Sequence, residues 1–309
     1  MTMRVFIDGA AGTTGLEIRE RLSGRTDLAV VTLDDAARKD PAARAEALNA
    51  ADFVILCLPD DAAREAVAMI TNPETRVIDA STAHRTAADW SYGFAELDPG
   101  QADAIAAARF VANPGCYPTG FLALVRPLVR AGLVPPDWLF SVNAVSGYSG
   151  GGKAMIADFE SGDEATAYRA YALDLDHKHV PEMQKHARIE HPPIFTPSVT
   201  RTYRGMIVEV PLALHALPRR PAIETLRNTL VEAYAASAVI RVAEQGARLI
   251  RIEDDAGTDR MTLHVGGDAA TGQARLVATL DNLGKGAGGA AVQNLNIMAG
   301  LDPTAGLIL

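Results

Sequence analysis

The chain has 309 residues, 48% of them hydrophobic and 22% charged, a composition typical of a globular protein with room for two domains. Its 29 basic and 38 acidic residues give a net charge of −9, which argues against a nucleic-acid binder or a protein of anionic membrane surfaces. The only two cysteines, Cys57 and Cys116, exclude a disulfide scaffold and a zinc site built on cysteine pairs. The N-terminus lacks a signal-peptide pattern and no apolar stretch approaches the roughly 20 residues of a membrane span, so we expect a cytoplasmic protein.

The first hundred residues alternate between apolar runs and helical patterns. Apolar runs lie at 4–8, 28–33, 51–61 and 75–81, and helical spacing follows the first run and recurs in the alanine-rich stretch 41–50. This alternation predicts right-handed βαβ units and a parallel sheet covered on both faces. A sheet of this kind binds its ligand at the carboxyl ends of its strands.

The pattern changes after about residue 115 and becomes rich in strands. Helices are expected at 121–133, 223–236 and 288–302. Strands are expected at 138–150, where the strand enters a glycine-rich loop, and at 194–200, 204–214, 249–254, 261–268 and 275–284. These elements predict a second segment of the α+β type.

A glycine-rich turn joins the first strand to the first helix. Glycine at every third position lets the backbone turn tightly and approach a pyrophosphate, while the helix offers free N–H groups and the positive end of its dipole. The candidate cofactor-binding residues are Gly9, Ala11, Gly12, Thr13, Thr14 and Gly15. A plain strand-to-helix turn is the alternative interpretation.

The residues after the second strand bear on the choice of dinucleotide. An acidic residue there favours NAD, whereas a nearby arginine accommodates the 2′-phosphate of NADP. The sequence offers both, because Asp34 and Asp35 are followed by Arg38 and Lys39. These residues alone favour NADP only slightly over NAD as the cofactor.

Cys116 lies in the segment NPGCYPTG, directly before an apolar helical pattern. Pro118 suits the first turn of a helix, so Cys116 is predicted at a helix N-terminus, where the dipole stabilises a thiolate. Cys57 lies in the apolar run VILCLP, where a thiol is an inert hydrophobic group. We therefore expect Cys116 to be a nucleophile and Cys57 to be structural.

A thiolate beside a nicotinamide cofactor indicates attack on an activated acyl group and a thioester that accepts a hydride. That route needs an acid/base partner. His177 and His179, in DHKHVPE, are the candidates for it. The His-x-His spacing also suits zinc, but no third ligand is evident in the sequence, and we expect no metal.

These motifs together resemble the N-acetyl-gamma-glutamyl-phosphate reductase family, a branch of the aspartate-semialdehyde dehydrogenase superfamily. The resemblance covers nearly the whole chain, is closest to the shorter of the family's two sequence types, and is carried by GAAGTTG, NPGCYPTG, SGYSGGGK, DHKHVPEM, RGM and DNLGKGAGGAAVQN. It implies a Rossmann-like dinucleotide-binding domain at 1–115 and 285–309, and an α+β catalytic domain with a mixed sheet at 116–284. It also implies a homodimer or homotetramer.

The same resemblance implies NADPH-dependent reduction of N-acetyl-L-glutamyl 5-phosphate, a small acyl phosphate, to the 5-semialdehyde in arginine biosynthesis. Cys116 matches the nucleophile, and His179 is preferred over His177 as the acid/base. It favours Arg38 and Lys39 as contacts of the 2′-phosphate. The further cofactor candidates are Pro59, Ser81, Asn282, Lys285 and Gly286. In longer relatives the fourth strand continues as DLSADFR, whereas here it reads DASTAHR, which leaves the roles of Ser81 and Arg85 open.

Several polar residues are candidates for substrate binding. Arginine suits the carboxylate or phosphate of the substrate, and the loop after 145 is polar. The set is Asn113, Ser146, Gly147, Ser149, Arg201 and Arg204, with Asn113 and the Cys116 backbone N–H as oxyanion donors. Two other functions remain open: another acyl-phosphate reductase such as aspartate-semialdehyde dehydrogenase, and a non-catalytic dinucleotide-binding redox sensor.

Overall fold

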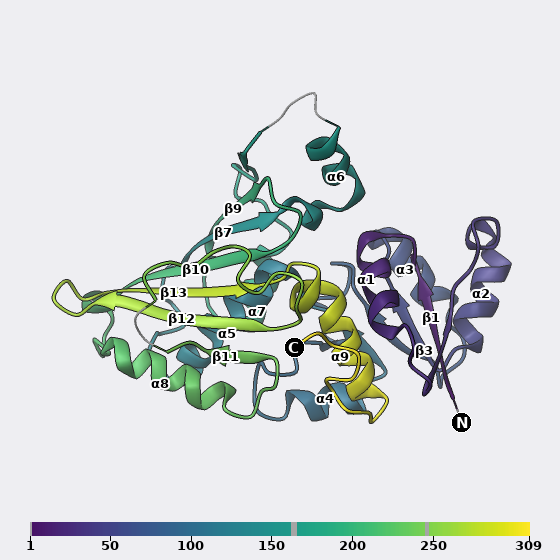
Figure 1. Cartoon of the computed structure of the whole chain (residues 1–309). Helices are drawn as coiled ribbons and strands as arrows, with labels where there is room; N and C mark the ends of the chain where they lie inside the picture. Colours follow the sequence, from purple (N-terminus) through teal and green to yellow (C-terminus); the bar gives the residue numbers. More distant parts are fainter. Residues whose placement is uncertain (1, 162–165, 245–246) are drawn as a thin grey trace. The chain divides into compact units, whose positions relative to one another are not determined.

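The computed structural model describes residues 2–161, 166–244 and 247–309. The chain divides into two compact units, each described by itself below (Figure 1). Unit 1 comprises Met1–Ala95, Pro99–Gly115 and Ala287–Leu307. Unit 2 comprises Glu96–Asp98, Cys116–Gly286 and Ile308–Leu309.

Unit 1 is built on a parallel sheet of six strands in the order β2-β1-β3-β4-β6-β5. The strands are β1 (Met3–Asp8), β2 (Leu28–Val31), β3 (Phe53–Leu56), β4 (Arg76–Asp79), β5 (Ser91–Tyr92) and β6 (Phe110–Ala112). The helices are α1 (Thr13–Leu22), α2 (Pro41–Ala50), α3 (Asp60–Met69), α4 (Gln101–Ala107) and α9 (Gly289–Met298), with a short 3-10 helix at Ala37–Lys39. The predicted parallel βαβ arrangement is confirmed.

Alternation along the strands explains why helices cover both faces of this sheet. Val5 and Ile7 of β1 pack with α1, α4 and α9, whereas Phe6 between them packs with α2 and α3. Ile55 of β3 belongs to the first cluster and Val54 to the second. Successive side chains of a strand point to opposite faces, so a strand covered on both sides is apolar throughout.

The C-terminal helix α9 is an integral part of unit 1. All of its residues are buried, and it packs against α1, α4 and β4. Arg76 of β4 donates to the carbonyl oxygen of Met298 and to those of Ala106 and Ala108 at the end of α4. The last carbonyls of a helix lack intrahelical partners, so one guanidinium satisfies the ends of both helices.

Gly9, the first glycine of the predicted nucleotide loop, has no room for a side chain. Its φ is +86°, and a Cβ would lie 2.2 Å from the carbonyl oxygen of Cys57. Gly9→Ala is expected to destabilise the protein by about 4 kcal/mol or more, because strain and a backbone clash combine. Gly24→Ala is the matched control, since its φ of +77° is similar but nothing lies within 4 Å of its Cβ. It should cost about 1–2 kcal/mol, and equal losses in urea unfolding would contradict the clash.

Unit 2 contains a mixed sheet of seven strands in the order β11-β12-β13-β10-β7-β9-β8. The strands are β7 (Ser141–Gly147), β8 (Tyr168–Ala170), β9 (Ile194–Thr200), β10 (Met206–Ala213), β11 (Ile240–Val242), β12 (Met261–Asp268) and β13 (Gln273–Leu280). The helices are α5 (Cys116–Arg130), α6 (Gly152–Glu160), α7 (Val180–Ala187) and α8 (Ile223–Tyr234), with 3-10 helices at Tyr148–Gly151 and Leu214–Ala216. A π-helical turn, Gly284–Gly288, leads toward α9. The predicted mixed sheet is confirmed.

One face of the second sheet is packed against helices, and no described residue covers part of the other face, called the open face below. α5 lies against β10, β12 and β13, and α8 lies against β11 and β12. At Gly120 a Cβ would come within 2.7 Å of the Val208 side chain, so a residue without a side chain lets α5 approach β10 closely. On the opposite face, Asn143, Thr196 and Pro211 are exposed.

The strand expected at 249–254 is absent from the structure, and that prediction is wrong. The backbone N–H of Arg251 donates to the carboxylate of Asp254 at 2.9 Å, which closes a turn. The carbonyl oxygen of Ile252 would lie 2.2 Å from a Cβ at Gly205. The alternating apolar residues therefore belong to a looped segment. Among the described residues, no helix combines the length and the apolar character that crossing a bilayer requires.

Candidate active site

In unit 1, the glycine loop has the geometry of a nucleotide-binding turn. The backbone N–H of Gly12 donates to the carbonyl of Gly9 at 2.9 Å, and Gly12 then caps α1. Gly15 is packed so tightly that a Cβ would lie 2.6 Å from the Gly9 carbonyl, whereas at Gly12 the nearest atom would be at 3.3 Å. Gly9 and Gly15 therefore have no room for a side chain, and the Cβ contact at Gly12 would be less severe.

A cavity of about 360 Å³ opens beside this loop. Of the predicted cofactor residues, Gly9, Ala11 and Arg38 line it, whereas Lys39 is not among the lining residues. Its volume is within the range of small-molecule sites. Residues that the sequence did not single out, among them Arg19 and Arg44, also line it.

Ser81 lies just beyond β4 and is held by a buried carboxylate. Its backbone N–H and its hydroxyl both donate to Asp79, at 2.9 and 2.7 Å. Asp79 also binds the Nδ1 of His84 at 2.7 Å, and the His84 ring stacks on Trp90 with centroids 4.1 Å apart. The Ser81 hydroxyl oxygen in turn accepts the backbone N–H of Ala83 at 3.1 Å, which closes the turn after β4. Pro59, another cofactor candidate, precedes α3 as its N-cap.

In unit 2, Cys116 is the first residue of α5, as the sequence predicted. It is half-buried, and Gly286 lies directly against it, because a Cβ at Gly286 would be 2.9 Å from the Cys116 Cβ. Cys57 has different surroundings. It packs against the core of unit 1, where burial and the nearby Asp79 and Asp8 raise the pKa of its thiol to about 12. Cys57 is therefore a thiol at neutral pH.

Aromatic rings surround the residue that follows Cys116. Tyr117 makes edge contacts with Phe195, His177 and His179, with centroids 5.1, 6.1 and 5.9 Å away. Its hydroxyl donates to the Ser198 carbonyl at 3.0 Å and accepts from the hydroxyl of Tyr171 at 3.2 Å. Burial raises the pKa of Tyr117 well above its ordinary value and that of Tyr171 to about 12. Both phenols are therefore neutral hydrogen-bonding groups.

The rings of the two candidate histidines, His177 and His179, lie next to each other, with centroids 4.7 Å apart, but make different contacts. The backbone N–H of His179 donates to Nδ1 of His177 at 3.1 Å, so His177 carries its proton on Nε2. Burial lowers the pKa of His177 to about 4, with a smaller contribution from the charge of Lys178. His179 is 7% exposed and caps α7. His177 is thus a neutral acceptor that holds the start of α7.

This lowered pKa predicts a pH-dependent contribution to stability. In the unfolded chain a histidine binds a proton below pH ~6.5, whereas folded His177 does so only below about pH 4. The unfolded state therefore binds more protons in this window, and the contribution is complete above pH ~6.5 and lost as the pH falls toward 4. Urea unfolding between pH 7 and 4 should show a smaller loss of stability in His177→Gln. An identical pH dependence in the two proteins would contradict the assignment.

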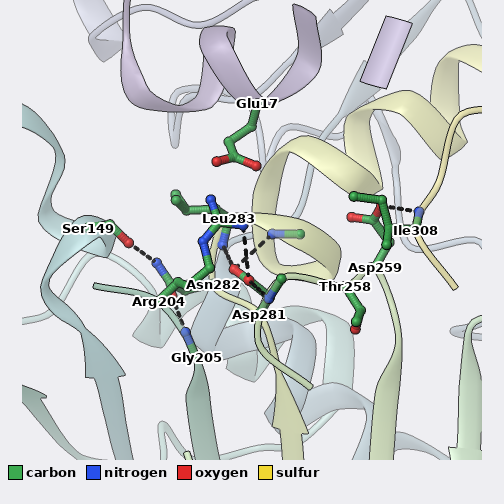
Figure 2. A network of polar contacts seen from close by, with 12 residues as sticks. Glu17, Ser149, Arg204, Gly205, Thr258, Asp259, Asp281, Asn282, Leu283 and Ile308 are labelled. Atoms are coloured by element: carbon green, nitrogen blue, oxygen red, sulfur yellow. Dashed lines mark hydrogen bonds and ion pairs between the residues drawn. The ribbon is translucent and has the colours of Figure 1, made fainter. Parts of the chain in front are cut away.

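Several predicted substrate and cofactor residues of unit 2 form one polar network (Figure 2). Asn282 accepts from the backbone N–H of Gly205 at 3.0 Å and donates to the Ser149 hydroxyl at 2.9 Å. Asp281, which is fully buried, accepts from the backbone N–H groups of Leu283 and Gly284 and pairs with Arg204 at 3.4 Å. The network ties β13 to the loops that follow β7 and precede β10.

The remaining candidates have different surroundings. Lys285 is 2% exposed and pairs with Glu96 at 2.8 Å. Arg201 is exposed. Ser146 is buried, and its hydroxyl donates a hydrogen bond to the Gly147 carbonyl. In unit 1, Asn113 donates to the Ala287 carbonyl at 3.0 Å and accepts from Asn294 at 3.0 Å, which fixes the end of β6. No group of three or more His, Cys, Asp or Glu within the described ranges is arranged to hold a metal.

Sequence reasoning missed Tyr171, Phe195 and Glu96, which lie in segments far from Cys116. Two left-handed residues three positions apart, Ala172 at φ +50° and Leu175 at +62°, mark the bend that follows Tyr171. Non-glycine residues of this kind often occur at functional sites, but the sequence carries no sign of them.

Comparison with known proteins agrees with this architecture. The model of the semialdehyde dehydrogenase dimerisation domain matches residues 116–282, and that of the semialdehyde dehydrogenase NAD binding domain matches residues 35–105. A solved structure, aspartate semialdehyde dehydrogenase II from Vibrio cholerae, superposes with a TM-score of 0.73 at 16% identity, covering 97% of this chain and 98% of that one. At this identity the likeness shows the fold alone, which is that of the semialdehyde dehydrogenases.

More similar sequences define the family within that class. N-acetyl-gamma-glutamyl-phosphate reductases from Brucella anthropi and Brucella ovis are each 53% identical to this chain. The alignments cover 97% of this chain, 99% of the Brucella anthropi protein and 100% of the Brucella ovis protein. The chain belongs to the N-acetyl-gamma-glutamyl-phosphate reductase family.

Proposed function

We propose that this protein uses NADPH to reduce N-acetyl-L-glutamyl 5-phosphate to N-acetyl-L-glutamate 5-semialdehyde and phosphate, in arginine biosynthesis in the cytoplasm. The observation that carries the proposal is Cys116 at the start of α5, beside Tyr117 and two histidine rings, in a chain 53% identical to curated reductases of this name. We assign cofactor binding to residues 1–115 and 285–309 and catalysis to residues 116–284.

In the proposed reaction the Cys116 thiolate attacks the acyl carbon of the substrate, phosphate leaves, and a thioester remains on the sulfur. A helix N-terminus favours the thiolate, and its free backbone N–H groups stabilise the oxyanion. NADPH supplies the hydride that reduces the thioester. His179 protonates the oxygen to give the hemithioacetal and takes that proton back as the C–S bond breaks, which releases the aldehyde and the Cys116 thiolate.

The described contacts support His179, not His177, as the proton-transfer group. His177 uses its Nδ1 to accept the His179 backbone N–H, and its pKa of about 4 keeps the ring neutral. A group with such a low pKa is a poor proton carrier near pH 7, because efficient general acids and bases titrate near the working pH. His177 therefore positions His179.

The residues of the polar network are proposed to bind the substrate's anionic groups. Arg204 is partly exposed, with its side chain 27% accessible, and its pairing with Asp281 fixes its direction. Arg201 is proposed as a second contact, because bidentate guanidinium groups suit carboxylate and phosphate. Ser146 and Gly147 at the end of β7 and Ser149 in the 3-10 helix that follows are proposed as further contacts, together with Asn113. Asn282, Lys285 and Gly286 are proposed to approach the cofactor.

One assay tests the function in the reverse direction. With N-acetyl-L-glutamate 5-semialdehyde and inorganic phosphate, the protein should reduce NADP, and omitting phosphate should abolish the signal. Aspartate semialdehyde is the comparison substrate. A preference for it would show that the protein is an aspartate-semialdehyde dehydrogenase instead. NADP binding without turnover of either aldehyde would favour a redox sensor.

The open face of the second sheet is proposed as a contact with another copy of this chain. A groove there is lined by Asn143, Thr196, Glu209, Tyr168 and Leu173, and the last two are 59% and 84% exposed. Exposed apolar surface next to an uncovered sheet is typical of an oligomer interface. Leu173→Asp is expected to lower the molar mass measured by light scattering to that of a smaller species. An unchanged mass would argue against this face.

A further inference from the structure

The cavity in unit 1 carries more positive charge than the glycine loop requires. It lies at the carboxyl ends of β1 and β2, with apolar walls from Leu33, Leu58 and Ala62. Arginines from three different elements also line it: Arg19 from α1, Arg38 from the 3-10 helix, and Arg44 from α2. Asp8 and Asp35 are the acidic residues of the lining.

The acidic residues after β2 are already occupied by the protein itself. The carboxylate of Asp34 accepts the backbone N–H groups of Ala36 and Ala37, at 3.0 and 2.8 Å, and so caps the 3-10 helix. Asp35 pairs with Arg38 at 3.0 Å. An acidic residue at this position favours NAD by accepting the ribose 2′-hydroxyl. Asp34 is engaged through one oxygen and Asp35 only through an exposed ion pair, so the arginines that line the cavity carry the choice between NADP and NAD.

Arg44 is the residue held most firmly beside the cavity. Its Nε and Nη2 both donate to one oxygen of Asp8, at 3.2 and 2.8 Å, and Asp8 is 5% exposed. Nη1 makes no hydrogen bond within the part of the chain that the structure describes. A guanidinium fixed on one edge and open on another is preorganised for an anion.

Arg19 and Arg38 complete the cluster and are easily redirected. The side chain of Arg38 is 45% exposed and that of its partner Asp35 is 90% exposed, so their ion pair contributes little to stability. For Arg19, the structure records no side-chain hydrogen bond or ion pair with any described residue. Both arginines are therefore available to a dianionic group entering the cavity.

We infer that Arg44 binds the 2′-phosphate of NADP, together with Arg19 and Arg38, and that Asp8 is the positioning residue for Arg44. This inference rests on the proposed function only for the identity of the nucleotide. A nucleotide without the 2′-phosphate makes no charge-assisted contact with these three guanidinium groups, so the cluster selects NADP over NAD.

Binding of two fragments to the full-length protein tests the inference without any catalytic turnover. Isothermal titration calorimetry with adenosine 2′,5′-bisphosphate and with 5′-AMP gives the discrimination due to the 2′-phosphate alone. The parent protein should bind the bisphosphate at least about tenfold more tightly, since a charge-assisted hydrogen bond contributes about one to two factors of ten. Arg44→Ala should lower that ratio about tenfold or more and leave 5′-AMP binding unchanged.

Two further variants separate positioning from simple structure. Asp8→Asn keeps the shape of the side chain but holds Arg44 less firmly, so the ratio should fall while 5′-AMP binding persists. Arg44→Lys keeps the positive charge but lacks the planar guanidinium group, so it should recover part of the ratio of bisphosphate to 5′-AMP affinity. This variant also replaces Arg44→Ala in the test if Arg44→Ala does not fold. Arg4→Ala is the control, because Arg4 is an exposed arginine at the amino end of β1.

The outcomes distinguish this subsite from the enzyme's function. A parent protein that does not discriminate between the two fragments overturns the inference, as does an unchanged ratio in Arg44→Ala or, failing that variant, in Arg44→Lys. A protein that discriminates strongly but reduces neither semialdehyde retains the subsite and loses the proposed reductase activity.

Discussion

Replacing Cys116 by serine is expected to lower kcat on the order of 10³-fold or more, which corresponds to about 4 kcal/mol of lost transition-state stabilisation. Serine is almost the same size, so α5 and its contacts should persist, but an alkoxide is far harder to form than a thiolate. The measurement is phosphate-dependent reduction of NADP by the semialdehyde, together with a thermal melt to show that the fold is retained.

Cys57→Ala is the matched control for this experiment. Cys57 is the other cysteine of the chain, and its pKa of about 12 makes it unreactive at neutral pH. The variant should keep its activity, and iodoacetamide at pH 7 should label it and the parent protein once, at Cys116. If Cys116→Ser reduces the substrate at the parent rate, no thioester lies on the reaction path.

Replacing His179 by asparagine is expected to lower kcat by about 10²- to 10⁴-fold, the usual contribution of a general acid or base. His177→Gln should cost less than about tenfold, because glutamine still offers an acceptor for the His179 backbone N–H. The two variants thus separate proton transfer from positioning.

The pH profile makes the comparison sharper. His177→Gln should retain the pH dependence of kcat, whereas His179→Asn should lose the limb that reports the acid/base group. If His177→Gln had the larger effect and lost that limb, the two roles would have to be exchanged. Thermal melting of both variants at pH 7 separates these losses from unfolding.

The sequence predicted the parts of the fold that depend on local pattern. Fully apolar strands such as β3, separated by helices, predicted a parallel sheet. A strand is apolar throughout when both faces of its sheet are covered. Cys116 was placed correctly at the start of α5 because Pro118 is favoured in the first turn of a helix, although the same helix also accommodates Pro127 in its interior. Gly9 was recognised from spacing, although the clash with the Cys57 carbonyl that makes it necessary appears only in the structure.

The parts that could not be predicted depend on contacts between distant segments. The Tyr117 hydroxyl meets Tyr171 and Ser198, which lie in segments 54 and 81 residues away. Arg44 reaches Asp8 from 36 residues away. Helical and strand periodicities describe neighbours along the chain, so they contain no information about such pairs. The failed strand at 249–254 has the same origin, because the Arg251–Asp254 turn competes with a pattern that suits a strand.

The burial of α9 in unit 1 has a consequence for biosynthesis. During translation the first strands are made well before the helix that covers Ile18, Ile78 and Ile105, because the segment Cys116–Gly286 of unit 2 lies between them in the sequence. Until then these side chains lack their cover, and transiently exposed apolar surface promotes aggregation. Unit 1 therefore completes its core only after residues 116–286 have been made, its contact order is high, and a nascent chain that stalls before α9 has a strong need for chaperones.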